Sequence, residues 1–276
     1  MIYLEHYPTN HLNLFIEKIW YCSAENLTTT TLTIPLPNHE LVLNFSESYE
    51  IKKAGDKHFA IENPKAWING LQSRPYYSYS TWRHEMLGVL FKANSLNAFF
   101  KHPSSEFTEA FIDARLVFGN SIETLIQQVQ HTCFVASKIK LVEDFLLAGC
   151  IRFQSPDYLT YSIKRLSDSL QPNGISGICS KLSVTNKSLI QAFKKHVGVS
   201  PVKYSHLHAI NTAISLLANA PGQSLTALAY RLNFYDQPHF IKFFKSITSL
   251  TPSQYVVQLT NKRVDVLSPN FISMEG

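Results

Sequence analysis

The chain has 276 residues and a formal net charge of +5 at pH 7, and this length suits two domains that each bury a core of their own. No apolar run reaches the ~18 residues that a membrane-spanning helix needs, and the first residues lack the charged-then-apolar pattern of a signal peptide. Both observations argue against a membrane protein, and we expect a cytoplasmic, nucleoid-associated one.

The positive charge is concentrated in the C-terminal part of the chain. Residues 157–263 hold twelve Lys or Arg and three Asp or Glu, whereas residues 1–156 hold thirteen basic and fifteen acidic residues. A surface that binds DNA phosphates requires such an excess, although a basic domain can also be merely soluble. The motifs described below decide between these two interpretations.

Residues 1–92 are predicted to be rich in β structure. Three of their segments have strand-like composition between Pro, Asn or Gly turn signals, namely Leu27–Leu36, Leu41–Phe45 and Tyr76–Trp82. Residues 93–156 are predicted to be helical, at Ser95–Phe100, Ser121–Gln130 and Ser137–Phe153. These helices would either form a dimer contact or cover the core of their own domain, and the sequence favours neither.

The N-terminal region is also rich in aromatic residues. Small-molecule pockets are mostly apolar with a few polar groups, so these residues could line such a pocket, although they could equally be ordinary core residues. The ligand-binding candidates are Trp20, Trp67, Tyr77, Trp82 and Arg74.

Neither the cysteines nor the histidines predict a metal site or a cofactor. Cys22, Cys133, Cys150 and Cys179 lie far apart, with no Cys-x-x-Cys pair. His6, His11, His39, His58 and His84 are scattered and lack the His-x-His…Glu spacing of metal-binding cupins. We therefore expect no disulfide framework, no metal and no cofactor.

A pattern near the C-terminus occurs twice. Five apolar positions recur fifty residues later: Ile175, Ile178, Cys179, Leu182 and Val184 return as Leu225, Leu228, Ala229, Leu232 and Phe234. Seven further positions recur fifty-one residues later: Thr185, Leu189, Phe193, Lys194, Ser200, Pro201 and Tyr204 return as Asp236, Phe240, Phe244, Lys245, Thr251, Pro252 and Tyr255. A fixed period indicates duplicated supersecondary units.

Each copy has the content of a helix-turn-helix. In the first copy a short helix at Ile175–Leu182 precedes a second helix at 186–196, which Thr185 caps by accepting backbone hydrogen bonds. Gly198 is suited to end that helix in a left-handed conformation. Ser200-Pro201 then starts another helix, with Ser as the cap and Pro at the first helical position.

The second copy follows the same logic. Ser224 caps Leu225–Leu232, Asp236 caps a helix that runs to about Ile247, and Thr251-Pro252 opens the last helix. Between the copies, Pro201–Ala218 reads as one longer helix. Such a helix would fix the spacing of two recognition helices, which must lie roughly 34 Å apart to enter successive major grooves on one DNA face.

These residues resemble the AraC/XylS family of bacterial transcription regulators. The stretch from Ser224 through Lys245, together with Leu250–Tyr255, is very close to the family's signature, and Phe193–Pro201 is similar to its first helix-turn-helix. The resemblance covers about Ile175–Leu259. It implies a domain of seven helices, so that a first helix is expected at Tyr158–Leu170.

The upstream part resembles, more weakly, a cupin-like sensor domain of one AraC subgroup. The segments that carry this resemblance are Phe15–Tyr21, Ile34–Phe45, Asn69–Pro75 and Gly88–Phe91. The predicted fold class is therefore α+β, with a β-rich cupin-like domain and then an all-α domain of two helix-turn-helix units. We expect domain boundaries at 1–156, 157–263 and 264–276, the last being a C-terminal tail.

Three positions depart from the family pattern. Ser183, Asn233 and Ser249 stand where glycine is common. Asn tolerates a positive φ better than Ser does, so the first turn is expected to be distorted.

The resemblance also implies which residues contact DNA. The base-contacting candidates are Lys187, Ile190 and Gln191 in the first unit and Gln237, Pro238, Ile241 and Lys242 in the second, flanked by Asn186 and His239. The phosphate-contacting candidates are Lys194, Lys195, Arg231 and Lys245. The alternative for the lysines is a solvated helix face.

The function expected from these features is a sequence-specific regulator that binds double-stranded DNA. An activator is favoured because activation is commoner in the family, and RNA polymerase is then a partner. The N-terminal domain would bind a small-molecule effector or form a homodimer; the alternative is a ligand-independent binder that only dimerises. An alkylated-DNA repair protein is disfavoured because the cysteines are not clustered, so no enzymatic activity is expected.

Overall fold

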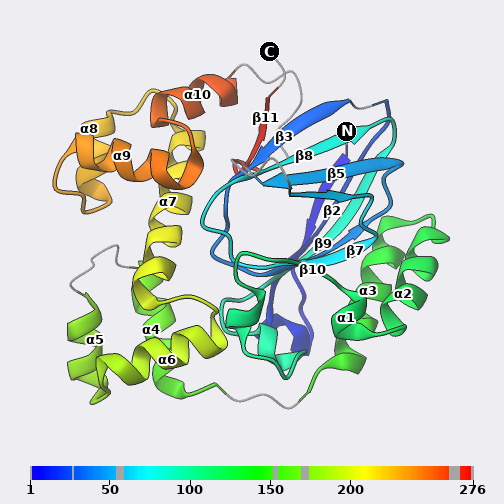
Figure 1. Cartoon of the computed structure of the whole chain (residues 1–276), viewed down its shortest axis with the longest axis horizontal. Coiled ribbons are helices and arrows are strands. Elements are labelled where there is room, and N and C mark those ends of the chain that lie inside the picture. Colours follow the sequence, from blue (N-terminus) through cyan, green and yellow to red (C-terminus); the bar gives the residue numbers. More distant parts are fainter. Residues whose placement is uncertain are drawn as a thin grey trace.

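The computed structural model describes residues 2–26, 28–53, 59–151, 155–168, 174–260 and 268–274. Two β-sheets face each other, three helices lie against one of them, and a separate group of helices stands beside this sandwich (Figure 1). The α+β class expected from the sequence is confirmed.

The larger sheet has six antiparallel strands in the order β1-β2-β9-β4-β7-β10. Their bounds are β1 (Ile2–His6), β2 (Ile16–Ala24), β9 (His84–Phe91), β4 (Glu40–Asn44), β7 (Ala66–Asn69) and β10 (Phe111–Asp113). Every residue of β4 and β9 is buried, which explains their continuous apolar runs. β10 lies beyond residue 92, in the stretch that was expected to be helical.

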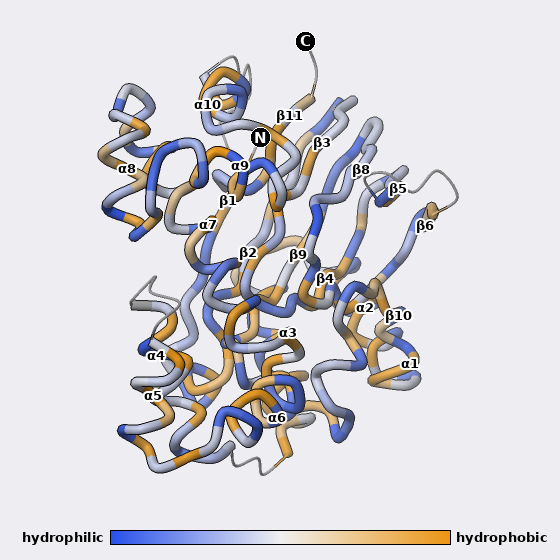
Figure 2. Tube along the Cα trace, turned by 60° about the vertical axis from the view of Figure 1, so that its left-hand side comes forward, coloured by the Kyte–Doolittle hydropathy of each residue, from blue (hydrophilic) through white to orange (hydrophobic). Residues whose placement is uncertain are grey.

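The smaller sheet has five strands in the order β11-β3-β8-β5-β6. Their bounds are β11 (Phe271–Ser273), β3 (Thr29–Thr33), β8 (Tyr76–Thr81), β5 (Ser48–Lys53) and β6 (Ala60–Glu62). β3, β8 and β5 are mostly pale or blue in Figure 2, because Thr, Ser and Tyr dominate β3 and β8 and half of β5 is charged. β11 comes from the C-terminal tail, so the chain closes back onto its N-terminal domain (Figure 1).

Alternate residues of the six-stranded sheet enter two different cores. Trp20, Val42 and Trp67 belong to a cluster that also contains Tyr49 and Ile51 of the opposite sheet. Their neighbours along the same strands, such as Tyr21, Leu41 and Ile68, point to the other face of the sheet, where they pack against helices.

Those helices are α1 (Arg115–Phe118), α2 (Ser121–Gln130) and α3 (Val135–Gly149). Ile122 and Leu125 of α2 and Val142 and Leu146 of α3 are buried against the sheet. Of the two roles that the sequence left open, the structure shows the helices covering the core of their own domain.

Two of the three helices predicted in this region need correction. Ser121–Gln130 is found with the predicted bounds, but Ser95–Phe100 contains only a short 3₁₀ helix at Leu96–Ala98. The helix predicted at Ser137–Phe153 begins at Val135 and ends at Gly149, because Cys150 already has an extended backbone. Residues 152–154 of that prediction lie outside the described residues.

The C-terminal part contributes seven described helices, as the resemblance implied. They are α4 (Asp157–Asp168), α5 (Gly174–Leu182), α6 (Asn186–His196), α7 (Pro201–Asn219), α8 (Leu225–Arg231), α9 (Gln237–Thr248) and α10 (Pro252–Thr260). The first helix was expected at Tyr158–Leu170; residues 169 and 170 lie outside the described part.

The caps predicted for these helices are present. Thr185 accepts a hydrogen bond from Ser188 N, and Ser200 accepts one from Lys203 N. In the second unit Ser224 accepts from Ala227 N, and Asp236 accepts from His239 N. Helix starts are therefore determined locally, by side chains that satisfy otherwise free backbone donors.

The two helix-turn-helix turns have the same geometry, which corrects the expectation of a distorted first turn. Ser183 has φ +53° and Asn233 has φ +59°. Val184 N donates to Cys179 O at 3.1 Å, and Phe234 N donates to Ala229 O at 2.9 Å. Ser183 adopts the left-handed conformation because these hydrogen bonds close the end of the first helix in both units.

The helix-turn-helix units share their cores with the N-terminal domain. Leu71 and Ala93 lie in the same cluster as Phe193 of α6 and its neighbours. Leu32 and Ile272 lie in the same cluster as the core of the second unit. None of the described helices is long and apolar enough to cross a membrane.

Candidate nucleic-acid interface

Helix α6 separates a buried face from an exposed face that is polar except for Ile190. Leu189 and Phe193 are completely buried in the core of the first unit. The opposite face carries the six first-unit candidates, all of them exposed: Asn186, Lys187, Ile190, Gln191, Lys194 and Lys195. The helix contains no acidic residue, so its positive charge is not compensated within the helix.

Helix α9 repeats this division. Phe240 and Phe244 are completely buried. Of the second-unit candidates, Pro238, His239, Lys242 and Lys245 are exposed, as is Arg231 at the end of α8, while Gln237 and Ile241 are half-buried. Like α6, helix α9 has no acidic residue of its own, and Asp236 stands just outside as its cap.

The two polar helices lie at opposite ends of α7 (Figure 1). At ~1.5 Å of rise per residue, the 19 residues of α7 span about 28 Å. Units attached at its two ends are therefore separated by a distance of the same order as one DNA turn, roughly 34 Å.

One contact orients a candidate side chain. Thr226 Oγ1 on α8 donates a hydrogen bond of 2.6 Å to Gln237 Oε1, at the start of α9. The amide oxygen of Gln237 thus already accepts a hydrogen bond, and its NH₂ group is free of that contact and can donate to a ligand.

The structure brings only two of the five ligand candidates together. Trp20 and Trp67 lie between the two sheets, in the aromatic cluster of the sandwich interior. Tyr77 instead packs against the core of the second helix-turn-helix unit, and Arg74 and Trp82 are exposed.

The sandwich interior also holds a buried carboxyl that sequence reasoning missed. Trp20 Nε1 donates to Glu40 Oε1 at 2.6 Å, and burial raises the pKa of Glu40 to about 7. Trp67 Nε1 is buried and finds no hydrogen-bond partner in the part of the chain that the structure describes. Only the pairing of distant strands places these groups together, so no local pattern could have revealed them.

Cys22 and His84 form a second buried contact, with 3.4 Å between Sγ and Nε2. Burial raises the pKa of Cys22 to about 12 and lowers that of His84 to about 4, so both groups are neutral near pH 7. The described residues contain no group of three or more His, Cys, Asp or Glu that could hold a metal ion. His58 lies outside the described residues.

The chain matches two families of known proteins. Residues 178–258 match a family described as a helix-turn-helix domain, and residues 4–113 match a domain of unknown function. An uncharacterized HTH-type transcriptional regulator of Haemophilus influenzae is 30% identical over 100 residues, 33% of this chain and 33% of the relative. The match thus spans about a third of that relative's length.

Solved structures with a similar arrangement include ToxT from Vibrio cholerae, at 13% identity and a TM-score of 0.48, covering 86% of this chain and 98% of that chain. ToxT bound to an unsaturated fatty acid is 14% identical with a TM-score of 0.46, covering 89% and 96%. The AraC-like transcriptional activator CuxR is 12% identical with a TM-score of 0.25, covering 81% and 89%.

Two helix-turn-helix units at the ends of one helix define a tandem helix-turn-helix domain, which here follows a β-sandwich domain. The family match over residues 178–258 agrees with this arrangement, so the C-terminal part of the chain is a helix-turn-helix domain, as its motifs implied.

Proposed function

We propose that this protein is a transcription regulator that binds a specific double-stranded DNA sequence, with α6 and α9 in successive major grooves. The observation that carries this proposal is the pair of exposed faces without acidic residues, one at each end of α7. DNA phosphates attract such faces, and the major groove admits an α-helix.

In the first unit, Gln191 and Lys187 read base edges. Gln can pair with adenine through two hydrogen bonds, Lys can donate to guanine, and the exposed Ile190 can contact a thymine methyl group. Lys194 and Lys195 lie in the last turn of α6 and contact phosphates, which orient the protein without specifying sequence.

In the second unit, Gln237, Lys242 and Ile241 take the corresponding roles. Because Thr226 engages the oxygen of the Gln237 amide, this side chain donates to an acceptor such as guanine O6 or N7. Pro238 and His239 flank it, and Arg231 and Lys245 contact phosphates.

For the N-terminal domain we propose an effector-binding role that governs activation of transcription. Two buried polar groups of the sandwich interior support it, the Glu40 carboxyl and Trp67 Nε1, which has no hydrogen-bond partner among the described residues. The alternative is a domain that only dimerises. A thermal-shift screen of the whole chain against a metabolite panel separates the two, since only an effector raises the unfolding temperature.

Selection of bound sites from random DNA tests the DNA-reading proposal. The wild-type chain should return a consensus of two elements about one helical turn apart. Gln191→Ala should cost about 1–3 kcal/mol on the best site and relax the preference at one base pair.

Gln128→Ala is the matched control, because Gln128 is exposed on α2, away from both polar helices. It should return the wild-type consensus. If Gln191→Ala also returned that consensus unchanged, Gln191 would not read a base, and if the wild-type chain returned none, the proposed function would be wrong.

A further inference from the structure

The corner between α6 and α7 is pressed against the N-terminal domain. Gly198, in this corner, has φ +97°. A Cβ atom at Gly198 would lie 2.9 Å from Ser104 O and 3.0 Å from Thr108 Oγ1. The close approach therefore depends on glycine, for its conformation and for its lack of a side chain.

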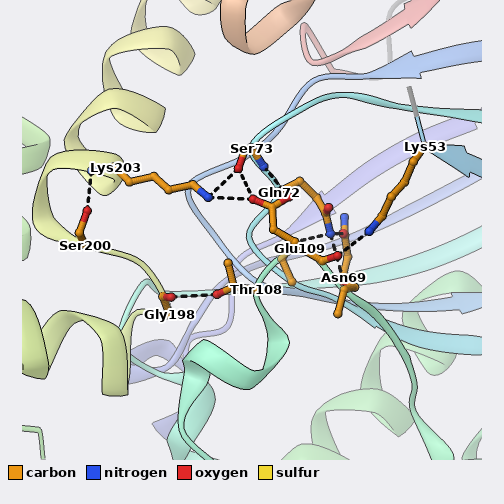
Figure 3. Close-up of polar contacts among 11 residues, drawn as sticks. Lys53, Asn69, Gln72, Ser73, Thr108, Glu109, Gly198, Ser200 and Lys203 are labelled. Carbon is orange, nitrogen blue, oxygen red and sulfur yellow. Dashed lines mark hydrogen bonds and ion pairs between the residues drawn. The ribbon is translucent and has the colours of Figure 1, made fainter. Parts of the chain in front are cut away.

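Two side chains of the N-terminal domain donate hydrogen bonds to this corner. Ser104 Oγ donates to His196 O at 3.0 Å, and Thr108 Oγ1 donates to Gly198 O at 2.8 Å (Figure 3 shows the second). The last carbonyls of a helix lack partners within the helix. Here the N-terminal domain supplies a donor to the last residue of the first recognition helix.

An ion pair extends the contact to the first turn of α7. Lys203 Nζ donates to Glu109 Oε1 at 2.8 Å and to Ser73 Oγ at 2.6 Å (Figure 3). Burial alone would raise the pKa of Glu109, but hydrogen bonds from Lys203 and Ser73 outweigh it and lower that pKa, so the carboxylate is charged at neutral pH.

Glu109 is itself held in place from several sides. Its backbone has φ +60°, a conformation that costs energy for a residue other than glycine. Its N–H donates to Leu71 O at 3.0 Å, and its carbonyl accepts from Lys53 Nζ at 2.6 Å. The surrounding structure thus holds the backbone of Glu109 at the place where its carboxylate contacts Lys203.

The second unit is attached to the same sandwich at other points. Asn211 of α7 donates to Pro35 O at 2.9 Å, and Asn270 donates to Asn211 Oδ1 at 2.8 Å. Tyr255 of α10 donates to Pro269 O at 2.9 Å. Both units are therefore anchored to one domain, separately.

We propose that the loop Ser104–Glu109 is a brace that sets the position of α6 relative to α9, so that the N-terminal domain takes part in reading DNA. Ser104, Thr108 and Glu109 are its positioning residues, and none of them touches DNA. This inference rests on the proposed function. It goes beyond it because the spacing of the two recognition helices then depends on the N-terminal domain as well as on α7.

If the loop sets the position of α6, the affinity for DNA depends on the spacing of the two half-elements. A contact that only holds the two domains together predicts no such dependence. One additional base pair between the two half-elements shifts the second by ~3.4 Å and rotates it by about 35°. A braced α6 resists that displacement, so the intact protein should bind sites of altered spacing poorly. When the hydrogen bonds or the ion pair of the brace are removed, α6 can move to the shifted position of its major groove.

Binding to DNA of varied spacing tests the brace. The probes are the selected site and versions with one base pair inserted or removed between the half-elements. The variants are Thr108→Val, which removes a donor at constant shape, and Glu109→Gln and Lys203→Met, which remove opposite charges from one ion pair. Each is assayed well below its unfolding temperature.

We expect the wild-type chain to lose about tenfold or more in affinity on the altered sites, since a mismatch of register costs several base contacts. In all three variants this penalty should shrink by about threefold or more. Agreement between Glu109→Gln and Lys203→Met excludes a simple charge effect on DNA, because the two substitutions change the net charge in opposite directions.

Lys140→Met is the matched control, since it cuts an exposed Lys–Asp pair within α3. It should keep the wild-type penalty. If the three brace variants kept that penalty while unfolding at a lower temperature, the loop would only hold the domains together and the brace would be refuted. A wild-type chain that selects a site but tolerates every spacing refutes the brace alone; one that selects no site refutes the proposed function, and the brace with it.

Discussion

Single residues in this protein are constrained by contacts that their sequence neighbours do not reveal. Gly198 is needed because its backbone is left-handed and because a loop some 90 residues earlier leaves no room for a side chain. Glu40 is an acidic residue within an apolar strand, and its burial beside Trp20 raises its pKa to about 7. Each residue leads to a prediction about stability.

Gly198→Ala should destabilise the protein strongly. The left-handed conformation costs a residue with a Cβ about 1–2 kcal/mol, and the contact with Ser104 and Thr108 adds about 1–3 kcal/mol. Urea unfolding measures the change. Gly177→Ala is the control: Gly177 lies within α5, and no described residue comes within 4 Å of the added Cβ, so a gain of about 0.5–1 kcal/mol is expected. Equal effects at the two positions would contradict this account.

Glu40→Gln should alter how stability depends on pH. Because the folded-state pKa of Glu40 is raised, its contribution is full below the unfolded value near 4.5 and is lost as pH rises through about 7. The variant has no such loss, so its free energy of unfolding relative to wild type should rise by about 1–3 kcal/mol between pH 5 and pH 8. Burial lowers the pKa of His84, so the contribution of His84 to stability rises with pH. This contribution is the same in the wild type and in the variant, and it cancels when their free energies of unfolding are subtracted. A difference that is constant with pH would show that Glu40 titrates normally.

At the scale of elements, short-range rules account well for the helix-turn-helix units. α6 has the bounds that its sequence predicts, because Thr185 caps its start and Gly198 closes its end. The helices of the N-terminal domain agree less well with the ranges predicted from the sequence. Leu96–Ala98 forms only a short 3₁₀ helix, buried beside the sheet, which shows tertiary packing overriding a local pattern.

The turn between α5 and α6 yields a prediction at this scale. Ser183→Gly should stabilise the first unit by up to about 1 kcal/mol, because glycine adopts φ +53° without the steric cost that serine bears. Chemical denaturation of the whole chain is the measurement. Ser180→Gly, at an exposed position within α5, should instead cost about 1 kcal/mol. Loss of stability in Ser183→Gly would mean that the Ser183 side chain contributes more than its backbone strain costs.

At the scale of the whole molecule, the N-terminal domain holds the helix-turn-helix domain at both ends of α7. The brace holds the first unit, and the C-terminal strap, Ser268–Met274, holds the second. Strap residue Phe271 packs edge-on against Trp20 in the sandwich, and Ile272 is completely buried in the core of the second unit. Coupling between the two domains thus follows from shared packing.

Removal of the strap should loosen the second unit. A chain that ends at residue 267 loses the buried Ile272 and the pairing of β11 with β3, and should be about 2–4 kcal/mol less stable. Hydrogen exchange should become faster in α10, whose Tyr255 loses its acceptor, Pro269 O. A chain that ends at Met274 keeps the strap and is the control. If hydrogen exchange in α10 is unchanged in the chain that ends at residue 267, the strap does not stabilise α10.

The sequence by itself determined the C-terminal elements, the duplicated motif and the helix-turn-helix class of that domain. Caps, turn residues and apolar periodicity act over about four to twelve positions, so a single chain displays them without its fold. The candidate DNA-contacting residues lie on α6, α8 and α9 and are exposed except for the half-buried Gln237 and Ile241, and their contacts with DNA remain a prediction.

Only the tertiary structure decided how the two domains meet. The order of the strands, the pairing of β11 with β3 and the burial of Glu40 depend on segments far apart in the chain. The Lys203–Glu109 pair joins residues 94 positions apart, and neither residue stands out in its local sequence. Such contacts exist because two cores pack together, and packing between distant segments leaves no periodic trace in the sequence.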